Sequence, residues 1–133
     1  MAGMPPAIQN ALAVGAGGCL GSLLRYGLIL LAQRLAPLAG FPHATLAANL
    51  SGCLVIGALA GLADARGDFA PAVRAFLFTG VLGGFTTFSS FGYETLLLAR
   101  EGQAIHALAN VLLHVGVGLA LVWLGYALAA GRA

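Results

Sequence analysis

The stretch GGFTTFSSF, residues 83–91, interrupts an apolar run that otherwise extends from about residue 72 to residue 98. Two glycines, which are poor helix formers, stand here beside four hydroxyl side chains. Backbone that leaves the helical conformation inside hydrocarbon is tolerated only where it is buried in protein or lines a polar cavity. The stretch therefore predicts a helix that breaks in mid-membrane, with a functional site at the break. A glycine kink whose hydroxyls bond back to the preceding turn is the alternative.

The composition of the 133 residues indicates that a lipid bilayer is the main solvent. Hydrophobic residues make up 60% of the chain and charged residues 8%, whereas ordinary globular domains carry about a quarter charged residues. Runs at 11–32, 44–63, 72–98 and 105–128 are long enough to cross a bilayer as helices and too long for barrel strands. We therefore expect an all-α protein, residues 1–133 forming a single domain of four transmembrane helices, with no room for a separate catalytic domain.

The few charges exclude one class of partner and leave the orientation open. The chain has no lysine and a formal net charge of +2, which is too small and scattered for nucleic acid. One side of the predicted bundle carries Arg66, Arg74 and Arg132, and the other carries Arg34 and Arg100. Three against two does not orient a chain by the positive-inside rule. The balance is either an accident of small size or a sign that the chain inserts both ways up and works as an inverted pair. Because four short helices are a thin scaffold for a pathway, we expect a homo-oligomer in either case.

Small residues suggest where the helices approach one another most closely. Glycines recur at four-residue spacing, which places both members of a pair on one face of a helix and lets two backbones come together in lipid. The pairs are Gly17/Gly21, Gly57/Gly61 and Gly80/Gly84.

The aromatic and hydroxyl side chains after the glycines are the first candidates for an ion site. Phe88 and Phe91 are three residues apart, so they share a face of the helix that resumes after the break. Phenyl rings in a membrane usually serve packing, but their positive edges can meet an anion without holding it too tightly to leave. The hydroxyls of Thr87, Ser89 and Ser90 add hydrogen-bond donors beside these rings.

Polar residues in the second and fourth spans are the next candidates. The amide of Asn49 either donates to an anion or bridges two helices. Asn110 and His114, four residues apart, form a polar stripe that would be costly against lipid, so it faces protein or a pathway. His114 has no second histidine or carboxylate at ligand spacing in its span, which favours a hydrogen-bonded histidine over a metal ligand or proton relay.

Arg25 is the only formal charge well inside a predicted span, and ionisable residues at membrane depth are functional candidates by default. Its side chain either snorkels to the membrane surface or holds a positive potential over a vestibule that attracts anions. Glu94, three residues after Phe91, is either a partner for another polar group or a solvated charge at a helix end.

Three stretches, in this order and spacing, resemble the signature stretches of the small fluoride channels, the Fluc or CrcB family. They are GGCLGSLLRYGL (17–28), ATLAANLSGCLVIG (44–57) and GVLGGFTTFSSFGYE (80–94). The resemblance covers nearly the whole chain. It implies a multi-pass protein of a prokaryotic cell membrane, a dual-topology antiparallel homodimer with two pores that passively export fluoride, and a structural sodium ion on the twofold axis.

The resemblance also implies roles for particular residues. Backbone carbonyls of Gly83 and Thr86 would hold the sodium ion, and Arg25 would be the vestibule charge. Asn110 and His114 stand where such channels often have tyrosine and serine, so the polar track they belong to is present in altered form. The fluoride pore is expected at Asn49, Thr87, Phe88, Ser89, Ser90, Phe91, Asn110 and His114.

Other functions are less well supported by the sequence. Small multidrug exporters also have four helices and balanced charge, but they carry a membrane-embedded glutamate in the first span, where this chain has Arg25. A non-conducting assembly subunit would need no broken helix with four hydroxyls. No nucleophile with its base and no metal cluster can be assembled from the spacing of the residues, so an enzyme is not expected.

Overall fold

The computed structural model describes residues 3–35 and 40–131, and in these ranges the regular structure is helical throughout, without strands. The chain forms α1 (Pro6–Leu35) and α2 (His43–Arg66), and then a third span made of α3 (Pro71–Arg74), the π-helical segment η1 (Ala75–Leu82), α4 (Gly83–Phe85) and α5 (Phe88–Arg100). A fourth span consists of α6 (Ala104–Leu112), the π-helical segment η2 (Leu113–Val117) and α7 (Gly118–Ala129).

The four spans are long and apolar enough to cross a membrane. They cover Pro6–Leu35, His43–Arg66, Pro71–Arg100 and Ala104–Ala129. The predicted runs 11–32, 44–63, 72–98 and 105–128 each fall inside one of them. The expected all-helical, multi-pass membrane protein is confirmed.

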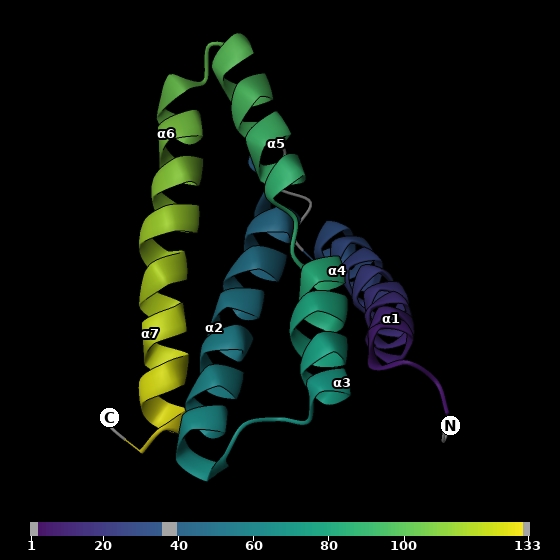
Figure 1. Cartoon of the computed structure of the whole chain (residues 1–133). Helices are drawn as coiled ribbons and strands as arrows, with labels where there is room; N and C mark the ends of the chain where they lie inside the picture. The colour runs from purple at the N-terminus through teal and green to yellow at the C-terminus, as the bar shows by residue number, and fades with distance from the viewer. Residues whose placement is uncertain (1–2, 36–39, 132–133) are drawn as a thin grey trace.

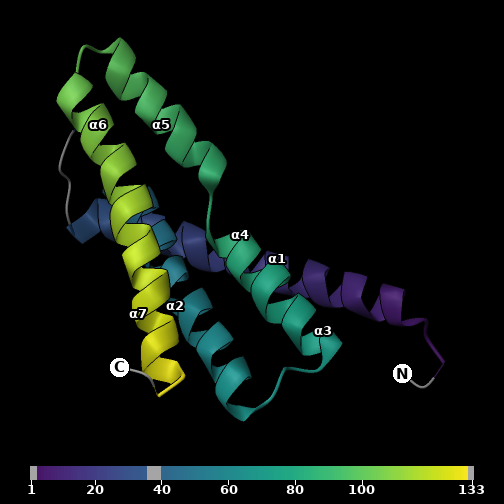
Figure 2. The same ribbon diagram turned by 60° about the vertical axis from the view of Figure 1, so that its left-hand side comes forward.

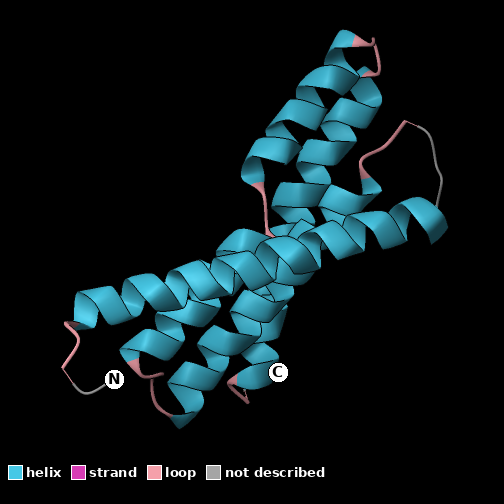
Figure 3. Cartoon of the chain, turned by 90° about the vertical axis from the view of Figure 1, so that its right-hand side faces the viewer, coloured by secondary structure: helices cyan, strands magenta, loops and turns pink. Residues whose placement is uncertain are grey.

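The two halves of the third span pack in different parts of the molecule. Helix α2 lies along α7, and α3, η1 and α4 lie on α1, which crosses the other helices at a steep angle (Figures 1 and 3). After α4 the chain diverges, and α5 pairs with α6 in a hairpin that extends away from α1 (Figure 2). The two halves of the third span therefore have different packing partners.

Glycines form the closest contacts between these helices. Gly57 and Gly61 of α2 face the backbone of α7 at Val122 and Tyr126, so closely that neither position has room for a Cβ atom. The same holds on the other side of the molecule, where Gly17 and Gly21 face η1, and Gly80 and Gly84 face α1. The close approach predicted from the three glycine pairs is confirmed.

The third span is broken, as predicted, but the glycines of the stretch do not form the break. Gly83 has helical torsion angles, φ −63° and ψ −37°. The extended residues are Thr86, with φ −89° and ψ 157°, and Thr87, with φ −150° and ψ 107°. The physical reason lies in packing, because a Cβ on Gly84 would stand 3.1 Å from Cα of Gly18. This glycine serves the contact between α4 and α1, and the backbone leaves the helix only after that contact.

We predict that Gly57→Ala destabilises the protein by about 1–3 kcal/mol, because the added methyl group forces α2 and α7 apart. Unfolding of the detergent-solubilised protein by a denaturing detergent, followed by circular dichroism, measures the change. Gly116→Ala is the matched control, since nothing lies within 4 Å of a Cβ at that position. Equal stability of the two variants would contradict a backbone contact at Gly57.

Candidate ion pathway at the broken helix

The side chain of Asn49 holds the extended backbone at the break. Its Nδ2 donates to the carbonyl oxygen of Thr87 at 3.1 Å, and the Thr87 amide donates to its Oδ1 at 2.8 Å. The carboxamide thus satisfies both polar groups of one residue that has left the helix. Asn49 is a bridge between α2 and the third span, one of the two roles expected. A carboxamide carries two Nδ2 protons, and the second has no acceptor in the part of the chain that the structure describes, so it remains available to a ligand.

The hydroxyl groups at the break end one helix and start the next. Thr86 donates its hydroxyl to the carbonyl of Leu82 at 2.9 Å, which is the back-bonding expected of a kink. Thr87 is the N-cap of α5, where its Oγ1 accepts from the Ser90 amide at 3.3 Å and donates to Ser90 Oγ at 3.0 Å. Ser89 Oγ lies 3.3 Å from the same Thr87 oxygen. The hydroxyls predicted to line a pore are therefore also those that cap the resumed helix.

The break releases several carbonyl oxygens from the helical hydrogen-bond pattern, and those of Gly83 and Thr86 are among them. In an unbroken helix the amides of Thr87 and Ser90 would donate to the carbonyls of Gly83 and Thr86. Here these amides donate to Asn49 Oδ1 and Thr87 Oγ1 instead. No other backbone amide in the described ranges replaces them across the break. The two carbonyls predicted to hold sodium are thus among those left without helical partners, and neutral oxygens suit a hard cation.

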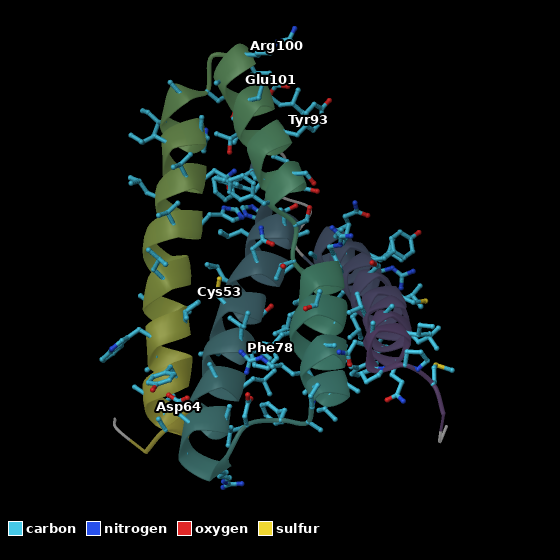
Figure 4. All side chains as sticks on the ribbon, in the orientation of Figure 1. Cys53, Asp64, Phe78, Tyr93, Arg100 and Glu101 are labelled. Atoms are coloured by element: carbon cyan, nitrogen blue, oxygen red, sulfur yellow. The ribbon has the colours of Figure 1, made fainter. Side chains whose placement is uncertain are left out.

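A cavity of about 380 Å³ lies at the break, between α2, the third span and η2. Seven of the residues predicted from sequence line it: Asn49, Gly83, Thr86, Thr87, Phe88, Phe91 and His114. Its remaining lining is mostly apolar and consists of Gly52, Cys53, Ile56, Phe78, Leu82 and Val115. Figure 4 shows Cys53 and Phe78 among the helices in the middle part of the molecule. The cavity combines a few polar groups with aromatic and aliphatic walls, as small-ligand sites do.

Three rings follow one another along one wall of this cavity. The centroids of Phe88 and Phe91 are 5.3 Å apart with the planes tilted by 58°, which confirms the predicted shared face. The ring of Phe91 in turn lies on His114, with a centroid distance of 4.4 Å and a tilt of 36°. Phe91 is buried, whereas 81% of Phe88 is exposed. A large apolar side chain that lines the cavity is thus mostly exposed in the single chain.

A polar cluster continues from the rings toward the α5–α6 turn. Thr45 Oγ1 donates to Glu94 Oε1 at 2.6 Å, and Asn110 Nδ2 donates to Thr95 Oγ1 at 2.9 Å. His114 Nδ1 lies 2.9 Å from the carbonyl oxygen of Asn110. Asn110 is completely buried and His114 lines the cavity, so the expectation that this stripe faces protein or a pathway is confirmed.

Thr45, Glu94 and Thr95 were not predicted as site residues. Their spacing held the signal, because Glu94 continues the three-residue repeat of Phe88 and Phe91, and Thr45 stands four residues before Asn49. Glu94 is half-buried and has a buried carboxylate oxygen. It is therefore a partner within the protein, and the alternative of a solvated charge at the helix end is wrong.

None of the arginines in the described ranges lines the cavity, although the guanidinium of Arg74 lies 4.9 Å from the ring centroid of Phe78, which does. Arg25 is half-buried on α1, one turn beyond Gly21, and makes no hydrogen bond or ion pair within the described ranges. Arg100 lies at the α5–α6 end of the molecule, opposite the end that carries Asp64 (Figure 4). Arg66 and Arg74 flank the α2–α3 connection, where Arg74 pairs with Asp68 at 2.9 Å. Arg34 lies in the last turn of α1, and Arg132 is outside the described residues.

The comparisons with known proteins all indicate the same family. Residues 12–126 match the model of the CrcB-like protein family, Camphor Resistance. A fluoride-specific ion channel FluC of Methylobacillus flagellatus is 49% identical over 91% of this chain and 94% of its own length. One of Paracoccus denitrificans is 47% identical over 90% and 94%, and one of Salinibacter ruber is 49% identical over 84% and 83%. On this evidence the chain belongs to the CrcB family.

Proposed function

We propose that this protein is a fluoride-selective channel through which fluoride leaves a prokaryotic cell by passive conduction. The observation that carries the proposal is the cavity at the broken helix, where an amide of Asn49 and the rings of Phe88 and Phe91 meet. Relatives over most of the chain are named fluoride-specific ion channels. Membership of this family also supports a channel over an exporter of the small multidrug class, an assembly subunit or an enzyme.

The geometry supports conduction because its donors are few and weak. Fluoride is small and strongly hydrated, so a pathway must replace its water before the ion can enter. The unused Nδ2 proton of Asn49, the hydroxyls that cap α5 and the positive ring edges can each replace part of that shell. None of these groups carries a full positive charge, so the ion is not held too tightly to leave. Chloride is larger, so the same donors would replace less of its hydration shell in a narrow pathway.

We expect vesicles that contain only this purified protein to release fluoride rapidly and chloride at the rate of protein-free vesicles. An ion-selective electrode measures the efflux. A potassium ionophore starts it, because potassium then leaves together with fluoride and no opposing membrane potential builds up. Comparable rates for the two anions would contradict a fluoride-selective channel.

We expect Asn49→Asp to lower fluoride efflux by at least about tenfold, the scale of one lost charge-assisted hydrogen bond together with a repulsive charge. The aspartate can still accept from the Thr87 amide, but it has no donor for an anion. Gln9→Glu makes the same chemical change on α1, outside the cavity, and should conduct at the parent rate. Parent-like efflux in Asn49→Asp would show that Asn49 serves only to hold the break.

We further propose that two chains pair in opposite orientations, giving an antiparallel homodimer with two pores and a sodium ion on its axis. Exposed Phe88 and exposed Gly83 provide a surface at the break for a second copy. Arginines at both ends of the described spans favour neither orientation. Carbonyls of Gly83 and Thr86 from each chain would offer four oxygens to the ion, which would tie the two breaks together.

We predict that Gly83→Ala weakens the dimer and that replacing sodium by a large organic cation weakens the parent dimer. Within the chain a Cβ at Gly83 has only the Phe78 carbonyl nearby, at 3.9 Å, so its own fold does not require glycine. The methyl group would instead obstruct the second backbone and the shared ion. Light scattering of the detergent-solubilised protein during dilution measures the dimer fraction in each cation.

The control is Gly15→Ala near the start of α1, where a Cβ also meets open space. It should dimerise as the parent does and keep the sodium dependence. A Gly83→Ala dimer of parent stability would contradict pairing at the break. Equal parent stability in both cations would contradict the sodium site but not the dimer.

A further inference from the structure

His114 presents an unused nitrogen to the interior of the protein. Its Nδ1 lies 2.9 Å from the carbonyl oxygen of Asn110, and a carbonyl can only accept a hydrogen bond. The neutral ring therefore carries its proton on Nδ1, which makes Nε2 an acceptor. This Nε2 is buried and has no hydrogen-bond partner within the described ranges.

The buried polar atoms left without a partner in the described residues are all acceptors. They are Nε2 of His114, Oε2 of Glu94 and Oδ1 of Asn110. An anion that moves past Phe91 toward this cluster would meet acceptors and no free donor among these three atoms. Protonation of Nε2 would change one of them into a donor that also carries positive charge.

Two other titratable groups lie near the His114 ring or line the cavity with it. Glu94 of α5 interacts with it electrostatically, and Cys53 of α2 lines the same cavity. Asn110 on the preceding turn and Phe91 opposite the ring are uncharged. Of the three, histidine is the side chain whose charge ordinarily changes between about pH 5 and 8.

We propose that His114 is a proton-dependent anion site, at which Nε2 takes up a proton from water and the resulting N–H donates to fluoride beside the ring of Phe91. The proposal rests on the proposed channel function and adds a second ligand to it, the proton. No covalent bond between heavy atoms is made or broken. Because both ligands act at one nitrogen, each favours binding of the other by the same factor.

The direction of the pH dependence follows from this linkage. At fluoride concentrations below saturation, conduction is limited by how often the pathway is occupied. Acid increases the imidazolium form and hence the occupancy, so fluoride current rises as pH falls. We expect a rise of about tenfold between about pH 8 and pH 5.5, the scale of one added charge-assisted hydrogen bond.

Electrical recording of fluoride current in planar bilayers tests this, because neutral hydrogen fluoride crosses lipid without carrying current. His114→Gln keeps a polar side chain that does not titrate, and its current should be independent of pH. His106→Gln is the matched control on α6, since His106 is exposed and lies against Phe41, outside the cavity. This control should keep the pH dependence of the parent.

A pH-independent parent current, or a parent-like rise in His114→Gln, would overturn the proposal. A parent without fluoride current at any pH would instead contradict the proposed function. A second measurement tests the proposal even if His114→Gln does not fold. It follows the ring ¹⁵N resonances of the solubilised parent, which are assigned by the loss of signals in His43→Gln and His106→Gln.

At one pH near neutrality, fluoride should increase the protonated fraction of His114 and leave the other two histidines unchanged, and chloride should have no effect. A His114 ring that does not respond to fluoride would overturn the proposal without touching the channel function.

Discussion

The polar backbone of an extended segment has to be satisfied at the depth of the bilayer where no water is available, and in this protein Asn49 provides the partner. Its carboxamide bonds to both the amide and the carbonyl of Thr87. One side chain on an intact helix thereby stabilises a non-helical residue on its neighbour. This pair of hydrogen bonds fixes the extended residue from which α5 starts.

The break lies where the third span changes its packing partner. Its first half, α3 to α4, lies on α1 through glycines that leave no room for a side chain, and its second half, α5, lies along α6. A straight helix could not follow both partners. In lipid, helices associate through close van der Waals contact and buried hydrogen bonds, so the glycine contacts and the Asn49 bridge are the kinds of interaction that can hold such a bend.

The break in the third span also leaves polar groups available to a ligand. Two amides that would have closed the helix are used by Asn49 and Thr87, which frees carbonyls on one side. On the other side, the three-residue repeat of Phe88, Phe91 and Glu94 continues from the cap of α5 toward His114 and Asn110. The structure therefore combines weak donors near the break with unpartnered acceptors beyond Phe91, and protonation can alter only the second group.

Composition and helical periodicity were enough to predict a membrane protein with four spans, a broken third span and polar residues that face protein, because these patterns report on the surrounding lipid and on helix faces. The packing of the helices against one another, in contrast, selects which positions within 83–91 are extended, since Gly84 is needed against Gly18 and the threonines are not. It also decided that Asn49 binds Thr87, 38 positions away, and that Glu94 binds Thr45. Hydrogen bonds between spans depend on how helices are placed side by side, and helical periodicity fixes the face of a residue but not the partner it meets.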